Sequence, residues 1–350
     1  MEKDKSFELD CSESFNHKSV LDHSVPSARV KINYSGICGS DVHTIHGMGF
    51  HTKLKNPKVL GHEASGTILE ICGSFNDSDP TLKKGDHVTI NPIISCGKCE
   101  MCKEGKTNLC LNRKLLGSDV DGLLQEIVTV PLNNISKLDS SVELSLGALT
   151  EPLAVAVHTV KIASENGLEP GQDVLIFGAG KISLFISLVL KKLMNPKTIT
   201  VIGLNKDVEF RFPIFNENGI VTYTFNQLFG RNGEVLDHAS VKGKYNVVFE
   251  VSGSENGISG AFSYTRNRGN IIAVGLTESD IRFNSNILVR KEFKLIGSDS
   301  YLRDDFEDAI SFISNGMIKV EWVKFYDVEK CKDAFLKYEN SEVMAILFNF

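Results

Sequence analysis

The stretch DVLIFGAGKIS, residues 173–183, decides the fold of the second half of the chain. Residues 173–177 form an apolar run of buried-strand length, a glycine turn follows, and residues 182–193 are apolar over the length of a helix. Similar strand patterns recur at 198–202, 245–251 and 270–274. Strands that alternate with helical segments in this way predict parallel βαβ units.

The glycine turn has the spacing of a dinucleotide-binding fingerprint. In such a turn Gly178 bends the chain, and Gly180 lets the backbone approach a pyrophosphate at the helix N-terminus. Ser183 takes the third small position, where the helix lies close to the sheet. The sequence therefore predicts that Gly178, Gly180 and Ser183 bind a nucleotide cofactor.

The end of the next strand departs from that fingerprint. An acidic residue should bind the adenosine ribose hydroxyls there, but Gly203 occupies the position and Asn205 and Lys206 follow. Without a carboxylate to repel it, a 2′-phosphate could face Lys206 or Arg211. We therefore predict that Gly203, Asn205 and Lys206 contact the cofactor and that NADP(H) is preferred. The alternative is that Asp207, or a shift of one residue, restores NAD(H) binding.

The first half of the chain differs in pattern. Residues 20–95 alternate short apolar and polar positions between turns, which predicts a mostly antiparallel β domain. Within it, Cys38 and His62 have the side chains that bind zinc, and a carboxylate would be the third ligand. The candidates are Glu63, next to His62, and Glu151, farther along the chain. Three protein ligands leave one position for an alcohol or carbonyl oxygen. We also expect Asp41 to accept a hydrogen bond from the ligating imidazole.

Two further residues of the same stretch suit a proton path. Oxidation of an alcohol releases the hydroxyl proton as the hydride leaves the carbon. Ser40 lies close to the predicted ligand Cys38, so its hydroxyl could receive that proton. The imidazole of His43 could pass the proton to water near neutral pH. The sequence therefore predicts that Ser40 and His43 take part in catalysis.

A separate group of four cysteines predicts a second metal site. Cys96, Cys99, Cys102 and Cys110 lie within fifteen residues. Four thiolates can close a tetrahedral zinc or iron site, and a site with no open position is structural. We expect this loop to stabilise the fold without taking part in the chemistry.

Composition limits the classes of function. A length of 350 residues favours two domains, and the net charge of −6, with both signs mixed, gives no indication of nucleic acid or of an anionic membrane as a partner. The sequence contains no apolar run of transmembrane length, and its first residues lack the apolar core of a signal peptide. We therefore expect a cytoplasmic protein.

Taken together, these motifs resemble the zinc-containing medium-chain dehydrogenases, and within them the sorbitol or polyol dehydrogenase branch. The ligand stretch, the four-cysteine loop, the sequence EPL at 151–153 and the glycine turn follow the family's order from about residue 28 onward. The resemblance implies a GroES-like β domain at 1–154 and 290–350, with a Rossmann domain at 155–289. It also implies a homodimer or homotetramer.

The resemblance also assigns roles to site residues. It implies that Cys38, His62 and Glu63 bind a catalytic zinc and that Ser40 is the first proton acceptor. Glu151 would hold the zinc-bound water or approach the metal itself. The four clustered cysteines would bind a structural zinc.

The predicted activity is hydride transfer between a nicotinamide cofactor and a secondary alcohol, with a polyol and its ketose as the expected pair. One position weakens the substrate prediction, because Ser300 stands where the polyol branch usually has arginine before Tyr301. Thr44, His46, Glu151 and Tyr301 are the candidate substrate contacts. The alternatives are an NADPH-dependent reductase of a phosphorylated ketose, or an inactive relative that serves as a binding protein.

Overall fold

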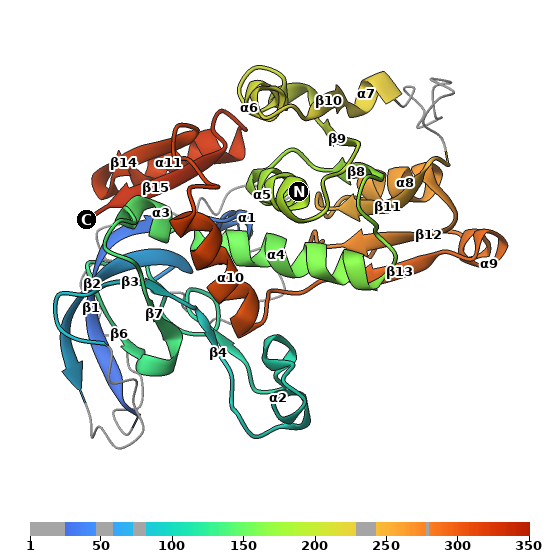
Figure 1. Cartoon of the computed structure of the whole chain (residues 1–350). Coiled ribbons are helices and arrows are strands. Elements are labelled where there is room, and N and C mark those ends of the chain that lie inside the picture. Colours follow the sequence, from blue (N-terminus) through green and yellow to red (C-terminus); the bar gives the residue numbers. More distant parts are fainter. Residues whose placement is uncertain (1–24, 47–58, 73–81, 229–242, 278–279) are drawn as a thin grey trace, which may run out of the picture. The chain divides into compact units, whose positions relative to one another are not determined.

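The structure, a computed structural model, describes residues 25–46, 59–72, 82–228, 243–277 and 280–350 (Figure 1). The chain forms two compact units. The first unit comprises Met1–Glu151, Phe306–Glu339 and Ala345–Phe350, and the second comprises Pro152–Asp305 and Asn340–Met344. Within the described residues, no helix is long and apolar enough to cross a membrane.

The first unit is built on a mostly antiparallel sheet, in the order β14-β15-β1-β2-β3-β7 with β6 paired to β1. Its strands are β1 (Ser27–Gly36), β2 (Glu63–Cys72), β3 (His87–Ile90), β6 (Ile127–Pro131), β7 (Ile135–Lys137), β14 (Val323–Asp327) and β15 (Ala345–Asn349). Alternate residues of these strands, including Val30, Ile32 and Val128, are fully or almost fully buried in one core. This alternation is what the sequence pattern predicts for a sheet with one buried face.

Short elements surround that sheet. The strand pair is β4 (Ile93–Ile94) with β5 (Lys114–Leu115). The helices are α1 (Gly39–Ile45), α2 (Glu100–Lys103), α3 (Leu144–Gly147) and α11 (Cys331–Glu339), with 3₁₀ turns η3 (Thr107–Leu109), η4 (Leu132–Asn134) and η6 (Val328–Lys330). Helix α1 begins directly after Cys38, so the first predicted ligand lies at its N-terminus.

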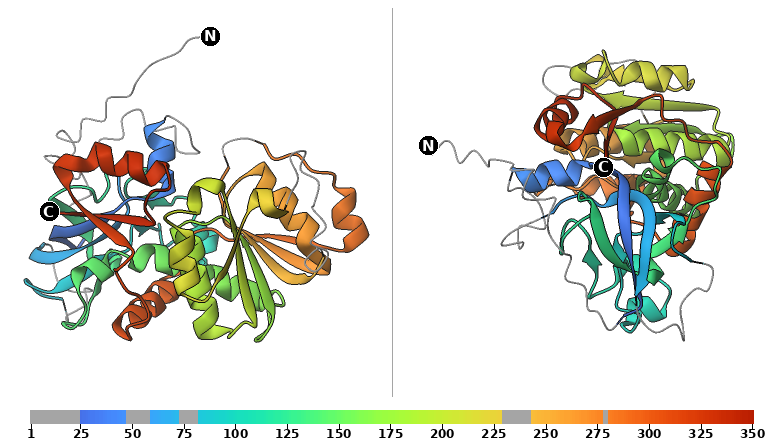
Figure 2. Two further views of the ribbon diagram at one scale, coloured as in Figure 1. Left: turned by 90° about the horizontal axis from the view of Figure 1, so that it is seen from above. Right: turned by 90° about the vertical axis from the view of Figure 1, so that its left-hand side faces the viewer.

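The second unit contains a six-stranded sheet in the order β10-β9-β8-β11-β12-β13, and every pair in it is parallel. The strands are β8 (Asp173–Phe177), β9 (Thr198–Gly203), β10 (Val221–Thr224), β11 (Tyr245–Glu250), β12 (Thr265–Ala273) and β13 (Lys294–Gly297). They fan out in the twist that such sheets adopt (Figure 2). This is the doubly wound order, whose direction reverses between β8 and β11 and places a ligand crevice at the carboxyl ends of those strands.

The helices of the second unit follow the predicted alternation. They are α5 (Lys181–Leu193), α6 (Phe212–Glu217), α7 (Phe225–Leu228), α8 (Glu255–Tyr264) and α9 (Asn286–Lys291), with the turn η5 (Asn205–Asp207). Helices α4 (Thr150–Glu165) and α10 (Arg303–Ser314) each continue across a unit boundary. The prediction of parallel βαβ units is confirmed by the sheet.

The second boundary lies later in the chain than the sequence suggested. We expected residues 290–350 to return to the first domain, but β13 pairs with β12 and completes the parallel sheet, so the second unit continues to Asp305. Asp305 is buried and accepts hydrogen bonds from His158 Nδ1 at 2.7 Å, Lys161 Nζ at 2.6 Å and the Leu302 amide at 2.8 Å. These bonds attach the start of α10 to α4.

Candidate metal and nucleotide sites

Cys38, His62 and Glu63 come together in the first unit. Each offers one ligand atom, and the three atoms lie within 4.8 Å of one another. The sheet brings them together, because Gly36 at the end of β1 pairs with Glu63 at the start of β2. A side chain at Gly36 would overlap the Glu63 carboxylate, so glycine leaves room for that group. The arrangement fits a metal with three protein ligands.

Asp41 joins the two segments that carry these ligands. Its carboxylate is buried and accepts the Cys38 amide at 2.8 Å and the Gly61 amide at 3.2 Å. The predicted hydrogen bond from the imidazole does not form, because Asp41 Oδ1 lies 3.7 Å from His62 Nδ1. Asp41 therefore holds the backbone of both ligand segments. Its carboxylate acts on the His62 imidazole through its charge and not through a hydrogen bond.

The charge of Asp41 acts strongly on His62. Burial lowers the pKa of the imidazole, but the negative charge of Asp41 and interactions with Cys38 outweigh burial and raise the pKa well above its usual value. Glu151 adds to the rise. A group of side chains with this much negative character suits a cation, which would take the place of the imidazole proton.

Glu151 is buried near the start of α4 and acts electrostatically on His62. It is absent from the ligand cluster found among the described residues, whereas Glu63 belongs to it. The geometry therefore groups Glu63, rather than Glu151, with Cys38 and His62.

A cradle of three glycines supports the histidine and was missed by the sequence analysis. The backbone of 122–124 runs beside that of 59–61, where the Gly122 amide bonds to Val59 at 2.9 Å and the Leu123 amide bonds to Gly61 at 2.8 Å. A side chain at Gly117 or Gly122 would overlap the carbonyl of Gly61. The only sequence signal was the glycines themselves, and Gly61 lies far from the other two along the chain.

The predicted proton path lies on helix α1. Ser40 and His43 are three residues apart and therefore share a face of the helix. Ser40 is half-buried, whereas His43 is exposed. The two side chains could therefore pass a proton from Ser40, near the predicted ligand Cys38, to the solvent-exposed imidazole of His43.

The candidate substrate contacts have different surroundings. Thr44 donates its hydroxyl hydrogen bond to the Ser40 carbonyl at 2.9 Å. His46 lies at the C-terminal end of α1, with its Nε2 3.1 Å from Glu339 Oε1. Tyr301 belongs to the second unit and is only 1% exposed.

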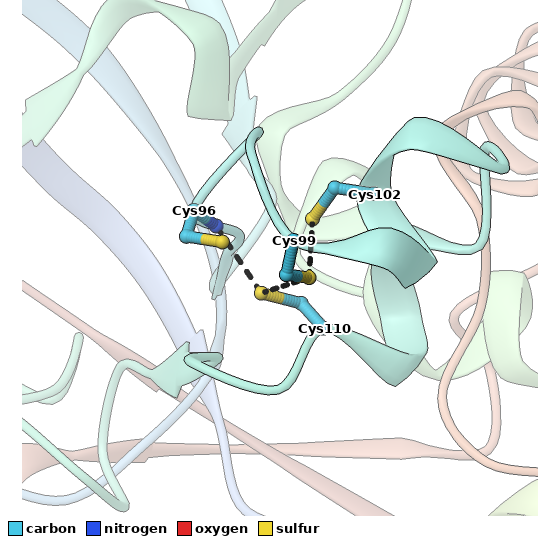
Figure 3. A group of neighbouring side chains, drawn as sticks. All are labelled: Cys96, Cys99, Cys102 and Cys110. Atoms are coloured by element: carbon cyan, nitrogen blue, oxygen red, sulfur yellow. Dashed lines mark hydrogen bonds between the residues drawn. The ribbon is translucent and has the colours of Figure 1, made fainter.

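The four cysteines form a second cluster, around α2 and η3 (Figure 3). Cys99 Sγ lies 3.5 Å from Cys102 Sγ and 3.8 Å from Cys110 Sγ, and the Cys96 amide donates to Cys110 Sγ at 3.2 Å. Zinc–sulfur bonds of about 2.3 Å place tetrahedral sulfurs about 3.8 Å apart. The sulfur spacing therefore fits a closed tetrahedral site.

The thiols of this cluster differ in acidity. Backbone amides of Lys98 and Cys99 lower the pKa of Cys96 to about 6. Amides of Cys102 and Leu111 also lower the pKa of Cys99, whereas burial raises that of Cys102 to about 12. The loop backbone thus stabilises thiolates at two corners, and a bound cation would favour deprotonation of all four.

The glycine turn after β8 has an open approach. Gly178 has a φ of +108°, and a Cβ there would lie 3.1 Å from the Ser252 amide nitrogen, so glycine suits this position on both counts. A Cβ at Gly180 would meet no atom within 4 Å, so the N-terminus of α5 is open to a ligand among the described residues. Ser183 is fully buried, and its hydroxyl has no hydrogen-bond partner within the described structure.

The end of β9 is crowded by three groups. A Cβ at Gly203 would lie 2.7 Å from the Phe212 ring and 2.8 Å from both the Ala179 Cβ and Asp207 Oδ2. Asp207 is buried, accepts the Leu204 amide at 2.7 Å and pairs with Arg211 at 3.3 Å. No additional side chain fits at Gly203 without a shift of these neighbours.

This packing bears on the cofactor-binding candidates. Arg211 also donates from Nε to the Val343 carbonyl at 3.1 Å, and only 12% of its side chain is exposed. Arg211 is therefore occupied within the fold, as is its partner Asp207. Asn205 and Lys206 are exposed on η5.

Comparison with known proteins identifies the family. Residues 26–140 match the family model of the alcohol dehydrogenase GroES-like domain, and residues 182–315 match that of the zinc-binding dehydrogenases. D-xylulose reductase A of Aspergillus niger is 33% identical over 312 residues, which cover 86% of this chain and 84% of that protein. The chain belongs to the zinc-containing medium-chain dehydrogenases. The predicted family and its polyol dehydrogenase branch are confirmed by these matches.

Solved structures of other dehydrogenases share the fold. An Escherichia coli CFT073 alcohol dehydrogenase in complex with NADH matches with a TM-score of 0.80 and 26% identity over 93% of each chain. L-idonate 5-dehydrogenase of Escherichia coli K-12 matches with a TM-score of 0.77 and 26% identity, over 94% of this dehydrogenase and 92% of that chain. The predicted GroES-like and Rossmann folds are confirmed, as is an oxidoreductase that uses zinc and a nicotinamide cofactor.

Proposed function

We propose that this dehydrogenase interconverts a polyol and its ketose, with Cys38, His62 and Glu63 as the ligands of the catalytic zinc. The observation that carries the proposal is the convergence of these three ligand atoms within 4.8 Å. Its curated relatives in Aspergillus are named for reduction of D-xylulose, a five-carbon ketose. A zinc ion at this position would polarise the alcohol or carbonyl oxygen.

The protein's own groups then manage the proton. In alcohol oxidation, Ser40 Oγ accepts the hydroxyl proton while it gives up its own hydroxyl proton, and His43 takes that proton and passes it to solvent from the same face of α1. Glu151, which is buried and close enough to influence His62, would orient a water or substrate hydroxyl at the site. The nicotinamide supplies the hydride acceptor.

The proton path can be tested with Ser40→Ala. We expect zinc content and cofactor affinity to stay near the parent values, while kcat falls at least about 100-fold, the usual contribution of a positioned acid–base group. Ser140→Ala, a substitution of an exposed serine in the same unit, is the matched control. Near-parent turnover by the Ser40 variant would remove this residue from the mechanism.

We further propose that Cys96, Cys99, Cys102 and Cys110 hold a second, structural zinc. The support is their tetrahedral spacing and the amides that lower the pKa of Cys96. Metal analysis should then give two zinc ions per chain, and one zinc would contradict the proposal.

A preference for NADP(H) is also proposed. Its support is the absence of a carboxylate at Gly203, the burial of Asp207 in contacts of its own, and the exposure of Lys206 beside the turn. Arg211, the other predicted phosphate partner, is not included because its guanidinium is occupied. The test compares kcat/KM for NADPH and NADH, and a clear preference for NADH would refute the proposal.

Substrate profiling separates the remaining possibilities. Turnover of unphosphorylated pentitols and hexitols, or of their ketoses, supports the proposal. Activity confined to phosphorylated ketoses would support the alternative reductase. Absence of turnover by fully zinc-loaded protein across this panel, with both cofactors, would favour an inactive relative.

We also propose a homodimer or homotetramer. Strand β13 is the edge of the parallel sheet, and Leu295 on it and Val289 on the preceding helix are 41% and 76% exposed. Exposed sheet edges with apolar side chains favour association. Light scattering coupled to size exclusion tests this, and a monomer at micromolar concentration would refute it.

A further inference from the structure

A buried carboxylate lies at the end of β11, where the sheet order reverses. Glu250 is the last residue of the strand and is 2% exposed. Its carboxylate accepts the Ser252 amide at 2.9 Å, the Gly253 amide at 3.2 Å and the Ser252 hydroxyl. One side chain thus holds the whole turn that follows β11.

The carboxylate also sets the direction of a hydrogen-bond chain. Because Ser252 donates its only hydroxyl proton to Glu250, its oxygen must accept from Ser254 Oγ, 2.8 Å away. Ser254 Oγ in turn accepts the Gly257 amide at 2.9 Å, as the N-cap of α8. Glu250 is buried, whereas Ser252 and Ser254 are exposed, so the chain ends at the surface of the turn.

This turn contacts the two neighbouring turns through backbone. Ser252 lies against Gly178 of the turn after β8, where a Cβ would be 3.1 Å from the Ser252 amide nitrogen. A side chain at Gly253 or Gly275 would overlap the backbone of the other's turn. The Glu250 carbonyl accepts the amides of Val274 and Gly275 at 2.8 and 3.0 Å. Glu250 therefore bonds to its own turn, which lies against Gly178, and to the turn after β12.

We propose that Glu250 is a positioning residue that fixes the turn 251–254 against Gly178 and thereby shapes the pyrophosphate-binding wall for the dinucleotide. The inference rests on the proposed nucleotide-dependent function. Three donors converge on two carboxylate oxygens, so an amide in place of the carboxylate would direct its own hydrogens toward at least one of them. A negative charge, rather than the size of the side chain, is what the turn requires.

The acidity of the group shows that the fold holds this charge at a cost in stability. Burial raises the pKa of Glu250, although the hydrogen bonds from Ser252 and Gly253 oppose the rise. A raised pKa means that folding favours the protonated form, so the stability from this group is greatest below the ordinary glutamate pKa and is lost as pH rises through the raised value. The fold therefore keeps a carboxylate that a residue chosen for stability alone would not supply.

The test uses Glu250→Gln in the zinc-loaded enzyme, with two probes and the melting temperature. NADPH spans the turn at Gly178, whereas 2′-AMP represents only the adenosine half, which would bind near Gly203. We expect the Kd of NADPH to rise about tenfold, as for loss of one charge-assisted hydrogen bond, and the Kd of 2′-AMP to change less than twofold. Glu250→Asp, which keeps the charge, should recover part of the NADPH affinity.

A control variant and a second variant of the same turn accompany this test. Glu255→Gln changes an exposed glutamate of the adjacent helix and should leave both affinities unchanged. Ser252→Ala removes only the hydroxyl donor at an exposed position, and we expect a several-fold loss of NADPH affinity that is not additive with that of Glu250→Gln.

Results that contradict the positioning role differ from the result that contradicts the proposed function. Unchanged NADPH affinity in Glu250→Gln, or an equal loss for both probes together with a lower melting temperature, would overturn the positioning role. Failure of the parent enzyme to bind any nicotinamide dinucleotide would instead overturn the proposed function, and this inference with it.

Discussion

Substitution of Asp41 by asparagine tests how the two ligand segments are held together. The carboxylate accepts amides from both segments, at 2.8 Å from Cys38 and 3.2 Å from Gly61. Asparagine keeps one acceptor and directs its NH₂ group at the other amide, which leaves a buried donor unpaired at a cost of about 1–3 kcal/mol. Loss of an outer-shell partner reduces metal affinity about 10- to 100-fold, or roughly 1.4–2.7 kcal/mol. The two estimates agree.

The assay measures turnover across a series of buffered free zinc concentrations. Only the catalytic zinc is expected to control turnover directly, so the zinc concentration at half-maximal activity reports this site rather than the four-cysteine site. We expect that concentration to rise 10- to 100-fold in Asp41→Asn, with activity partly restored at high zinc. Asp139→Asn, which changes an exposed aspartate, is the matched control. An unchanged midpoint would refute the role that we assign to Asp41.

Three further variants test other parts of the structure. Cys99→Ser should remove one zinc per chain and lower the melting temperature with little direct effect on kcat; unchanged metal content and stability would contradict a structural site. Burial raises the pKa of Asp305, but hydrogen bonds from a histidine and a lysine of α4 outweigh it and lower the pKa below its usual value. The stability that ionised Asp305 contributes is therefore present above its unfolded pKa of about 3.9 and is lost as the pH falls through its lower folded-state pKa. Asp305→Asn should lower the melting temperature by roughly 6–12 °C (about 3 kcal/mol) at pH 7 and by progressively less in acid. Gly122→Ala should weaken zinc retention because its methyl group would overlap the backbone before His62, whereas Gly297→Ala, where a Cβ meets no atom within 4 Å, should not.

The sequence contained enough information to predict secondary-structure elements and groups of metal-ligating residues that lie within one short segment. Residues 173–177 were predicted as a strand because an apolar run of that length, followed by a glycine turn and a helix, has few other solutions. The four cysteines were close enough along the chain for local geometry to predict a cluster. In both cases the signal lay within a single short segment.

Features that depend on contacts between distant segments could not be predicted in the same way. The glycine cradle places Gly117 and Gly122 against Gly61, and no periodic pattern links these positions. Asp41 was correctly associated with the cluster, but its actual partners are backbone amides, whose positions depend on how α1 meets the segment before β2. Strand β13 is short and largely exposed, so its sequence lacked the apolar run that would have assigned it to the parallel sheet.

Gly203 illustrates why a motif needs its structural surroundings. In the sequence its lack of a side chain suggested only that a repulsive carboxylate had been removed. In the structure the same space is filled by the Phe212 ring and by Asp207, whose carboxylate is held by Leu204 and Arg211. Gly203 is therefore coupled to a packed local group, and restoring an acidic residue there would displace that group as well as change the charge. If this position does influence cofactor choice, as we propose, a single substitution at Gly203 would not isolate its charge from the packing of Phe212 and Asp207.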